Sequence, residues 1–308
     1  MKKFSYVTSV RDKNLTVGQI LKKLGFSEKE ISRQKFVSGG IQLDDRQCRV
    51  TEKIREGQTL KLLFPEKKQI AGDAEGLKAD EIPEILYEDD DLIVVNKPEG
   101  LSSHQGRGHY QDNLGTRLQL WMVSQGISAS AVREIGRLDR DTSGLMVFAK
   151  NRISAARLSR QRQEGKLEKL YYALVWGSFV TERGVIDLPI GAVPGEKNKM
   201  EVSELGKKAV TCYRVIKSGA FRGREVSLLE CRLKTGRTHQ IRVHMAASGY
   251  SLVGDPLYGN DQEDKGVRLC LHAGSIRFLQ PFTGKEICVT VRPDSWPLNW
   301  EEETWQNG

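Results

Sequence analysis

The chain has 308 residues, with 38% hydrophobic and 29% charged side chains, which is typical of a globular protein with a hydrophobic core. No apolar run approaches the roughly 20 residues that a membrane-spanning helix requires, and no apolar segment of a signal peptide follows the basic start of the chain. The net charge is +8, and residues 1–70 carry all of the excess, with 16 Lys and Arg against 8 Asp and Glu. A basic region beside a neutral larger body favours a polyanionic partner, although a solvated Lys-rich surface would give the same count.

None of the five cysteines belongs to a Cys-x-x-Cys motif, and their number is odd. This pattern does not suggest a disulfide framework, and we expect a reducing, cytoplasmic compartment. His239 and His244 are five residues apart and have no acidic or Cys partner nearby, so we expect no metal site.

Residues 1–70 are predicted to form one small domain. The spacing of apolar residues predicts a helix within residues 15–25, and Ser27 and Glu30 form a capping box that opens a second short helix. After Gly39 and Gly40, the pattern predicts a strand over residues 41–43, a turn, and further strands that end at Phe64. Residues 71–84 are polar without periodicity and are predicted to be a linker.

Residues 85–300 are predicted to form a second, larger domain. Two short apolar strands flank the acidic turn at residues 88–91, and residues 113–125 have helical periodicity. Residues 136–144 contain two Asp, two Arg, Thr, Ser and Gly, which predicts a loop before a strand at residues 145–149. A helix capped by Asn151, a strand over residues 169–177 and several strands between residues 185 and 232 follow.

The loop at residues 136–144 has two interpretations. From residue types alone, Asp139 or Asp141 forms an Asx-type turn in which the carboxylate caps its own backbone. Loops at strand ends also commonly carry the chemistry of a protein, and an ionised carboxylate there could be catalytic.

The sequence around this loop, Arg-Leu-Asp-x-x-Thr-Ser-Gly-Leu at residues 137–145, resembles the active-site loop of the RluA family of pseudouridine synthases. Most members carry His where this chain has Gly136. Further matches follow the family's order, including Asp-Asp-Leu-Ile-Val-Val-Asn-Lys-Pro-x-Gly at residues 90–100 and Lys-x-Tyr-x-Ala-Leu-Val-x-Gly at residues 169–177. The segments Gly-Lys-x-Ala-x-Thr at residues 206–211 and Thr-Gly-Arg-Thr-His-Gln-Ile-Arg at residues 235–242 extend the resemblance.

The resemblance implies an α+β fold, in which a mixed, largely antiparallel sheet flanked by helices forms the catalytic domain. Residues 1–70 resemble an S4-like RNA-binding domain, with two basic helices followed by a small sheet. The implied reaction isomerises uridine in RNA to pseudouridine and requires no cofactor.

The resemblance also implies the roles of individual residues. Asp139 is the catalytic carboxylate, Arg242 orients and neutralises it, and Tyr171 stacks on the uracil and serves as an acid or base. The implied substrate-binding residues are Arg137, which could wedge into the RNA stack, Leu271, which could supply an apolar wall, and Arg237 and His239. Tyr171 could equally be a packing residue of its strand.

Several alternatives stay open at this point. Asp139 could attack C1′ of the ribose or take the C2′ proton, since both need the carboxylate. Large-subunit ribosomal RNA is the expected substrate, with transfer RNA as the alternative, and we expect a monomer. A non-catalytic ribosome-assembly factor is a competing function. So is a glycosidase or glycosylase, for which Asp141 would be the second carboxylate.

Overall fold

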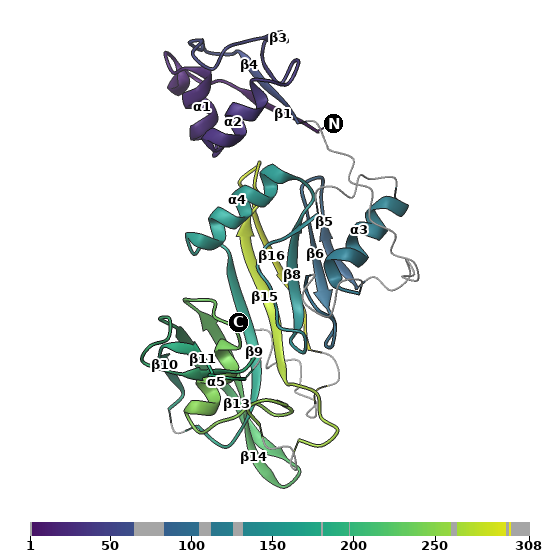
Figure 1. Cartoon of the computed structure of the whole chain (residues 1–308), viewed down its shortest axis with the longest axis vertical. Coiled ribbons are helices and arrows are strands. Elements are labelled where there is room, and N and C mark those ends of the chain that lie inside the picture. Colours follow the sequence, from purple (N-terminus) through teal and green to yellow (C-terminus); the bar gives the residue numbers. More distant parts are fainter. Residues whose placement is uncertain are drawn as a thin grey trace. The chain divides into compact units, whose positions relative to one another are not determined.

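The computed structural model describes residues 2–64, 83–104, 112–125, 132–179, 181–196, 198–259, 264–293 and 296 (Figure 1). The described chain divides into two compact units, one built mainly from residues 2–64 and the other from residue 83 onward. The linker expected at residues 71–84 lies outside the described residues, apart from its last two positions.

The first unit is a small antiparallel sheet with two short helices. The sheet has the order β1-β4-β2-β3, with strands at Lys2–Val7, Thr59–Phe64, Ile41–Leu43 and Arg46–Gln47. The helices α1 (Val17–Lys23) and α2 (Glu28–Gln34) occur where the sequence predicts them. The capping box of Ser27 and Glu30 is present, with Oγ of Ser27 accepting from the Glu30 amide. The strand β1 and a 3-10 turn at Val10–Asp12 were not expected. The two consecutive Lys residues that begin β1 interrupt the alternation of apolar and polar residues by which a strand is identified.

The second unit contains a ten-stranded sheet that is antiparallel except for one pair. Its strand order is β10-β13-β14-β9-β15-β8-β6-β5, with β16 paired to β15 and β7 paired to β8. The pair β15 and β8 is parallel. The mixed, largely antiparallel sheet of an α+β fold is therefore confirmed. The strands are β5 (Ile85–Glu88), β6 (Leu92–Lys97), β7 (Arg133–Glu134), β8 (Ser143–Ala149), β9 (Glu168–Trp176), β10 (Arg183–Asp187), β13 (Val210–Phe221), β14 (Arg224–Leu233), β15 (Leu271–Leu279) and β16 (Glu286–Thr290).

Helices cover both faces of this sheet, because its central strands are apolar on both sides (Figure 1). In β6, Ile93 and Val95 pack in the same core cluster as α3 (Leu114–Ser124), whereas Leu92 and Val94 pack in the cluster that contains α4 (Arg152–Gln163). This alternation follows the two-residue period of a strand. The side chain of Asn151 accepts hydrogen bonds from two amides of the first turn of α4, as expected for an N-cap.

Two segments differ from the expected elements. The strand β8 begins at Ser143 rather than Leu145, because Ser143 and Gly144 pair with His272 and Ala273 of β15. The segment Gln240–Ala247 forms a helix, α5, that was not expected. Its buried Arg242 and His244 interrupt the apolar pattern by which a helix is identified in a sequence.

The two remaining strands, β11 (Ile190–Ala192) and β12 (Met200–Val202), form a separate hairpin, and α5 packs against β12. Among the described residues, no helix has the length and apolar character needed to cross a membrane.

Candidate active site

The loop between β7 and β8 leaves the carboxylate of Asp139 without a partner among the described residues. The turn is closed by the backbone, since the Thr142 amide donates to the main-chain oxygen of Asp139 at 3.2 Å. The carboxylate of half-buried Asp139 makes no hydrogen bond or ion pair with any described residue. The Asx-type turn considered from residue types is therefore not what shapes this loop.

A second segment of the unit fixes the loop by hydrogen bonds. Oγ of Ser103 donates to the main-chain oxygen of Leu138 at 2.7 Å and accepts from the amide of the same residue at 3.2 Å. Both Ser103 and Leu138 are buried, so these bonds are shielded from water. The backbone directly before Asp139 is held in one position by this pairing.

The charge of Asp139 acts on several side chains around it, which shows that they share one neighbourhood. Burial raises the pKa of Tyr171, and the negative charge of Asp139 raises it further. A raised pKa keeps the phenol protonated, so Tyr171 holds its proton at neutral pH. Leu271 is buried in the same core cluster as Tyr171, on the neighbouring strand β15. The structure therefore brings Asp139, Tyr171 and Leu271 to one region of the sheet.

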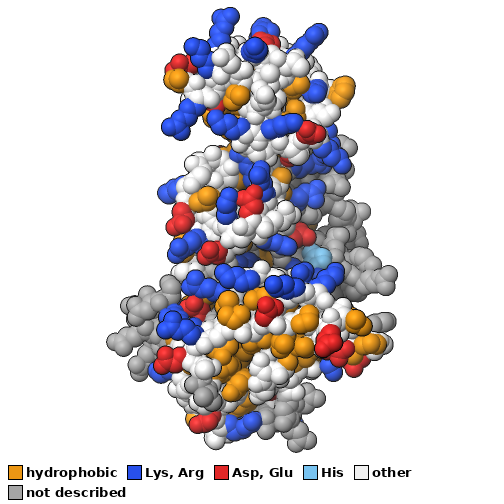
Figure 2. All heavy atoms as spheres, turned by 90° about the vertical axis from the view of Figure 1, so that its left-hand side faces the viewer, with side chains coloured by type: hydrophobic (Ala, Val, Ile, Leu, Met, Phe, Trp, Pro, Cys, Tyr) orange, Lys and Arg blue, Asp and Glu red, His pale blue; other side chains and the backbone are white. Residues whose placement is uncertain are grey.

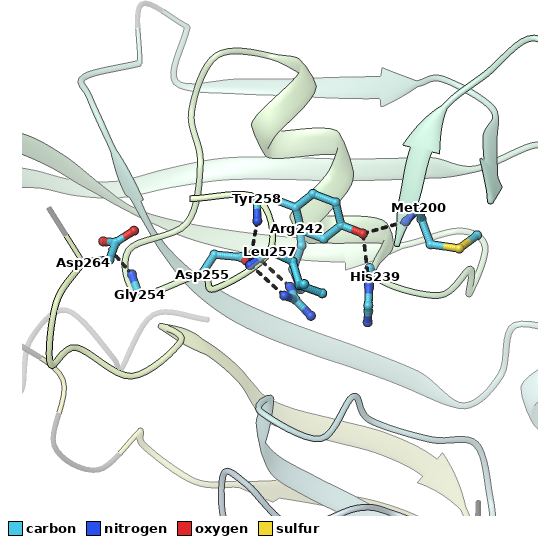
Figure 3. Close-up of polar contacts among 8 residues, drawn as sticks. All are labelled: Met200, His239, Arg242, Gly254, Asp255, Leu257, Tyr258 and Asp264. Carbon is cyan, nitrogen blue, oxygen red and sulfur yellow. Dashed lines mark hydrogen bonds and ion pairs between the residues drawn. The ribbon is translucent and has the colours of Figure 1, made fainter. Parts of the chain in front are cut away.

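Arg242 makes its ion pair with Asp255 rather than with the expected partner Asp139 (Figure 3). Its Nε donates to Oδ2 of Asp255 at 2.8 Å, and its Nη2 donates to Oδ1 at 2.7 Å. Both side chains are nearly inaccessible to solvent, so each neutralises a charge that would be costly alone. Asp139 affects Arg242 electrostatically, since its charge contributes to the raised pKa of Arg242. The direct pairing of Arg242 with Asp139 is therefore not present.

The turn that contains Asp255 also holds His239. Oδ1 of Asp255 accepts from the amides of Leu257 and Tyr258, and the Tyr258 ring lies beneath the Arg242 guanidinium at 5.1 Å. The Tyr258 oxygen accepts from the Met200 amide at 2.9 Å and lies 3.0 Å from Nδ1 of His239. Burial lowers the pKa of His239, while the charge of Asp139 opposes this effect. His239 is therefore placed beside Arg242 and within reach of the field of Asp139.

The two other expected substrate-binding residues lie at the surface. Arg137 is exposed, and its charge contributes to lowering the pKa of His239. Arg237 is also exposed, and its Nε donates to the main-chain oxygen of Lys208 at 2.9 Å. The guanidinium of Arg237 therefore supports the backbone of residue 208 rather than joining the group around Asp139. The described residues contain no group of three or more His, Cys, Asp and Glu side chains that could hold a metal ion.

Comparison with known proteins identifies the family. Residues 91–247 match the model of the RNA pseudouridylate synthase family, a range that includes the loop of Asp139 and the helix of Arg242. The chain belongs to the RNA pseudouridine synthases. Such an enzyme is an isomerase.

Relatives of this synthase cover most of its length. It is 34% identical over 270 residues to an RNA pseudouridine synthase, YjbO, of Bacillus subtilis, covering 87% of this chain and 92% of the relative. It is 40% identical over 229 residues to the ribosomal large subunit pseudouridine synthase D of Vibrio cholerae, covering 70% and 69%. The solved structure of human RNA pseudouridylate synthase domain containing 1 matches with a TM-score of 0.59 at 28% identity, covering 72% of this chain and 88% of that one.

Lys97 is a site residue that sequence reasoning missed in this synthase. Its side chain is fully buried, and Nζ donates to three main-chain oxygens, those of Pro98, Leu101 and Arg140, at 2.7–2.9 Å. The bond to Arg140 ties the loop after β6 to the residue that follows Asp139. The available signals were the family-like motif at residues 90–100, which contains Lys97, and the position of Lys97 at the end of a largely apolar strand, directly before Pro98.

The structure gives a local reason for Gly136. Its φ is +83°, in the left-handed region that favours glycine, and a Cβ there would lie 2.9 Å from Nη1 of Arg162. Arg162, from the end of α4, therefore occupies the space into which a side chain at position 136 would project.

Proposed function

We propose that this synthase isomerises uridine in large-subunit ribosomal RNA, with Asp139 as the catalytic carboxylate and without a cofactor. The single observation that carries the assignment of Asp139 is its carboxylate, which is free of described partners in a family-matched loop anchored by Ser103 and Lys97. An ionised carboxylate without internal partners is available to react. The choice of ribosomal RNA rests on relatives named ribosomal large subunit pseudouridine synthase D.

The reaction breaks the N1–C1′ bond of uridine and forms a C5–C1′ bond, and a proton leaves C5 while N1 gains one. Asp139 would serve at the ribose, either by attack on C1′ or by removal of the C2′ proton. Tyr171 would contact the uracil, and its raised pKa suits a group that keeps its proton near neutral pH. Leu271 would form part of the apolar surface behind the base.

Arg242 would act through electrostatics rather than through a direct bond to Asp139. Its guanidinium is held by both oxygens of Asp255, and its positive charge stabilises a negative carboxylate nearby. Arg137 and Arg140, both exposed beside Asp139, are placed to contact the phosphate backbone. Flipping the uridine out of a duplex costs a few kcal/mol, so a loop or bulge in the RNA is the expected target.

The first unit would supply additional RNA affinity as an S4-like domain. The basic excess of residues 1–70 supports this role, because Lys and Arg side chains attract the phosphate backbone. Figure 2 also shows Lys and Arg side chains that gather in a band across one face of the second unit, next to a group of hydrophobic side chains. Both features suit an extended, negatively charged partner.

The decisive experiment is site-resolved mapping of pseudouridine in total RNA from cells with and without the gene. We expect one or more sites in large-subunit ribosomal RNA to disappear in the deletion strain. The gene carrying Asp139→Asn should not restore these sites. The gene carrying Asp141→Asn should restore most of the modification, since the Asp141 carboxylate is partly exposed and lies 3.9 Å from Nε of Arg140.

Each other outcome contradicts a part of the proposal. Sites lost only from transfer RNA would overturn the ribosomal assignment, and an unchanged map would favour a non-catalytic factor. Restoration by Asp139→Asn would remove this residue from the mechanism. An equal loss of modification in Asp139→Asn and Asp141→Asn would favour a two-carboxylate mechanism. Release of free uracil would then identify a glycosylase.

A further inference from the structure

The contacts of Tyr258 favour one direction for its phenolic proton. The Met200 amide donates to the phenolic oxygen at 2.9 Å, and an amide N–H can only donate. The remaining partner of the hydroxyl among the described residues is Nδ1 of His239, at 3.0 Å. With the phenolic proton directed to Nδ1, the neutral imidazole accepts at Nδ1 and carries its own proton on Nε2.

The backbone and the ring packing hold His239 in one orientation. His239 precedes α5 with φ of +54° and ψ of +22°, a left-handed conformation that is uncommon for a residue with a side chain. Its ring meets the edge of the Tyr258 ring, with centroids 5.8 Å apart and planes at 76°. A strained backbone position kept in place by specific contacts is typical of functional sites.

The second nitrogen of the His239 ring faces away from its support. Figure 3 shows Nε2 turned away from Tyr258, on the side to which the Arg242 guanidinium also extends. Among the described residues, nothing accepts a hydrogen bond from Nε2 of His239. The charges of Asp139, Arg242, Asp255 and Arg137 all act on this ring, so His239 lies in the neighbourhood of the Asp139 carboxylate.

We propose that Tyr258 is a positioning residue that fixes the tautomer of His239, and that Nε2–H of His239 donates to a phosphate oxygen flanking the target uridine. A phosphate is the acceptor that suits this place, because the exposed Arg137 acts on the same ring and anionic oxygens accept stronger hydrogen bonds than neutral ones. The inference rests on the proposed function, since it places the RNA by the position of Asp139.

Two substitutions at position 239 separate this role from a structural one. The amide nitrogen of His239→Gln can reach the place of Nε2, whereas the shorter His239→Asn can replace only Nδ1. Asn tolerates the left-handed backbone better than Gln, so folding alone predicts that Asn is the milder change. We expect the opposite, with KM within about fivefold of wild type for His239→Gln and raised roughly 10- to 100-fold for His239→Asn, the loss expected for one hydrogen bond to a charged group.

These kinetics are measured by the release of tritium from C5-labelled uridine in ribosomal RNA from the deletion strain. The inference is overturned if His239→Asn matches wild type or if His239→Gln is as impaired as His239→Asn. Wild-type enzyme that releases no tritium would contradict the proposed function instead, so the two failures are distinguishable.

Nitrogen-15 NMR of histidine-labelled full-length protein tests the tautomer without RNA or turnover. We expect His239 to show an unprotonated Nδ1 and a protonated Nε2 at neutral pH, and Tyr258→Phe to produce a mixture of tautomers while keeping the ring beneath Arg242. A protonated Nδ1 in wild type, or an unchanged spectrum in Tyr258→Phe, would overturn the role of Tyr258.

A double-mutant cycle locates the acceptor. A short RNA that contains the mapped uridine is made with a methylphosphonate in place of the phosphate on either side. One of these RNAs should weaken binding to wild type but have much less effect on His239→Asn, because the contact is already lost. Fully additive losses at both phosphates would overturn the assignment of the acceptor.

Discussion

At the scale of single residues, the site depends on polar groups buried in unusual surroundings. Lys97 shows this most clearly, since a fully buried ammonium has three backbone oxygens as its hydrogen-bond partners. Burial lowers the pKa of Lys97 to about 7, although the charges of Asp141, Asp139 and Glu99 act in the opposite direction. The group that anchors the Asp139 loop therefore titrates close to neutral pH.

The lowered pKa of Lys97 predicts a pH-dependent contribution to stability. An unfolded Lys keeps its proton up to a pKa of about 10.4, so between pH 7 and 10 the unfolded state binds more protons and the unfolding free energy rises with pH. Relative to Lys97→Met, wild type should gain up to about 1.4 kcal/mol per pH unit in this window. Urea denaturation at pH 7 and pH 9 measures the difference.

Lys166 offers a matched control, because it is exposed and pairs only with a surface carboxylate. Lys166→Met should keep the pH slope of wild type. If Lys97→Met also kept that slope, the ammonium would titrate outside this range and the lowered pKa would be wrong.

At the scale of elements, the short helix α5 depends on a turn that follows it in the chain. Asp255 holds Arg242 by both oxygens and accepts two amides of its own turn, so one carboxylate joins the helix to residues 255–258. The same turn carries Tyr258, which contacts His239 at the start of the helix. The turn at residues 255–258 therefore holds both Arg242 and His239 in position.

Asp255→Asn should be strongly destabilising because it leaves the buried Arg242 without a compensating charge. The expected loss is about 3–5 kcal/mol of unfolding free energy. Glu164→Gln, which breaks an exposed pair with Arg160, should cost less than about 1 kcal/mol. Chemical denaturation of the full chain measures both, and a small loss for Asp255→Asn would mean that solvent reaches Arg242.

Gly136 joins the Asp139 loop to the end of α4 through a close approach of two elements. Gly136→Ala should cost about 1–2 kcal/mol for the left-handed conformation, plus the displacement of Arg162. Gly165→Ala is the control, since its φ is +71° and nothing lies within 4 Å of its Cβ. Adding Arg162→Ala to Gly136→Ala should reduce its cost to that of the control, and an unchanged cost would show that Arg162 already moves freely.

At the scale of the whole molecule, charge and chemistry belong to different units. The residues around Asp139 all lie in the second unit, whereas the excess positive charge lies within residues 1–70. The first unit has its own buried core, which includes Ile20, Leu21, Leu60 and Leu62. This arrangement predicts that RNA attraction and catalysis can be separated.

A chain that starts at residue 79 should keep a folded, active second unit but bind RNA more weakly. Each lost phosphate contact should flatten the slope of log affinity against log salt by roughly 0.7–0.9. The rate at saturating RNA should change little, since Asp139, Tyr171 and Arg242 remain. Binding titrations at several salt concentrations test this. Unchanged affinity and slope would show that the charge excess is only a solvated surface.

The sequence by itself determined the features that depend on neighbouring residues. The capping box of Ser27 and Glu30, the N-cap Asn151, the alternating strands and the motif order that indicated the family are all local patterns, because caps and periodicity involve residues a few positions apart. Only the tertiary structure decided the partners of buried charges. The pairing of Arg242 with Asp255, the three oxygens around Lys97 and the guanidinium beside Gly136 join elements that pack together in the fold. A buried charge must find a partner wherever the fold supplies one, and the local pattern does not specify which residue that is.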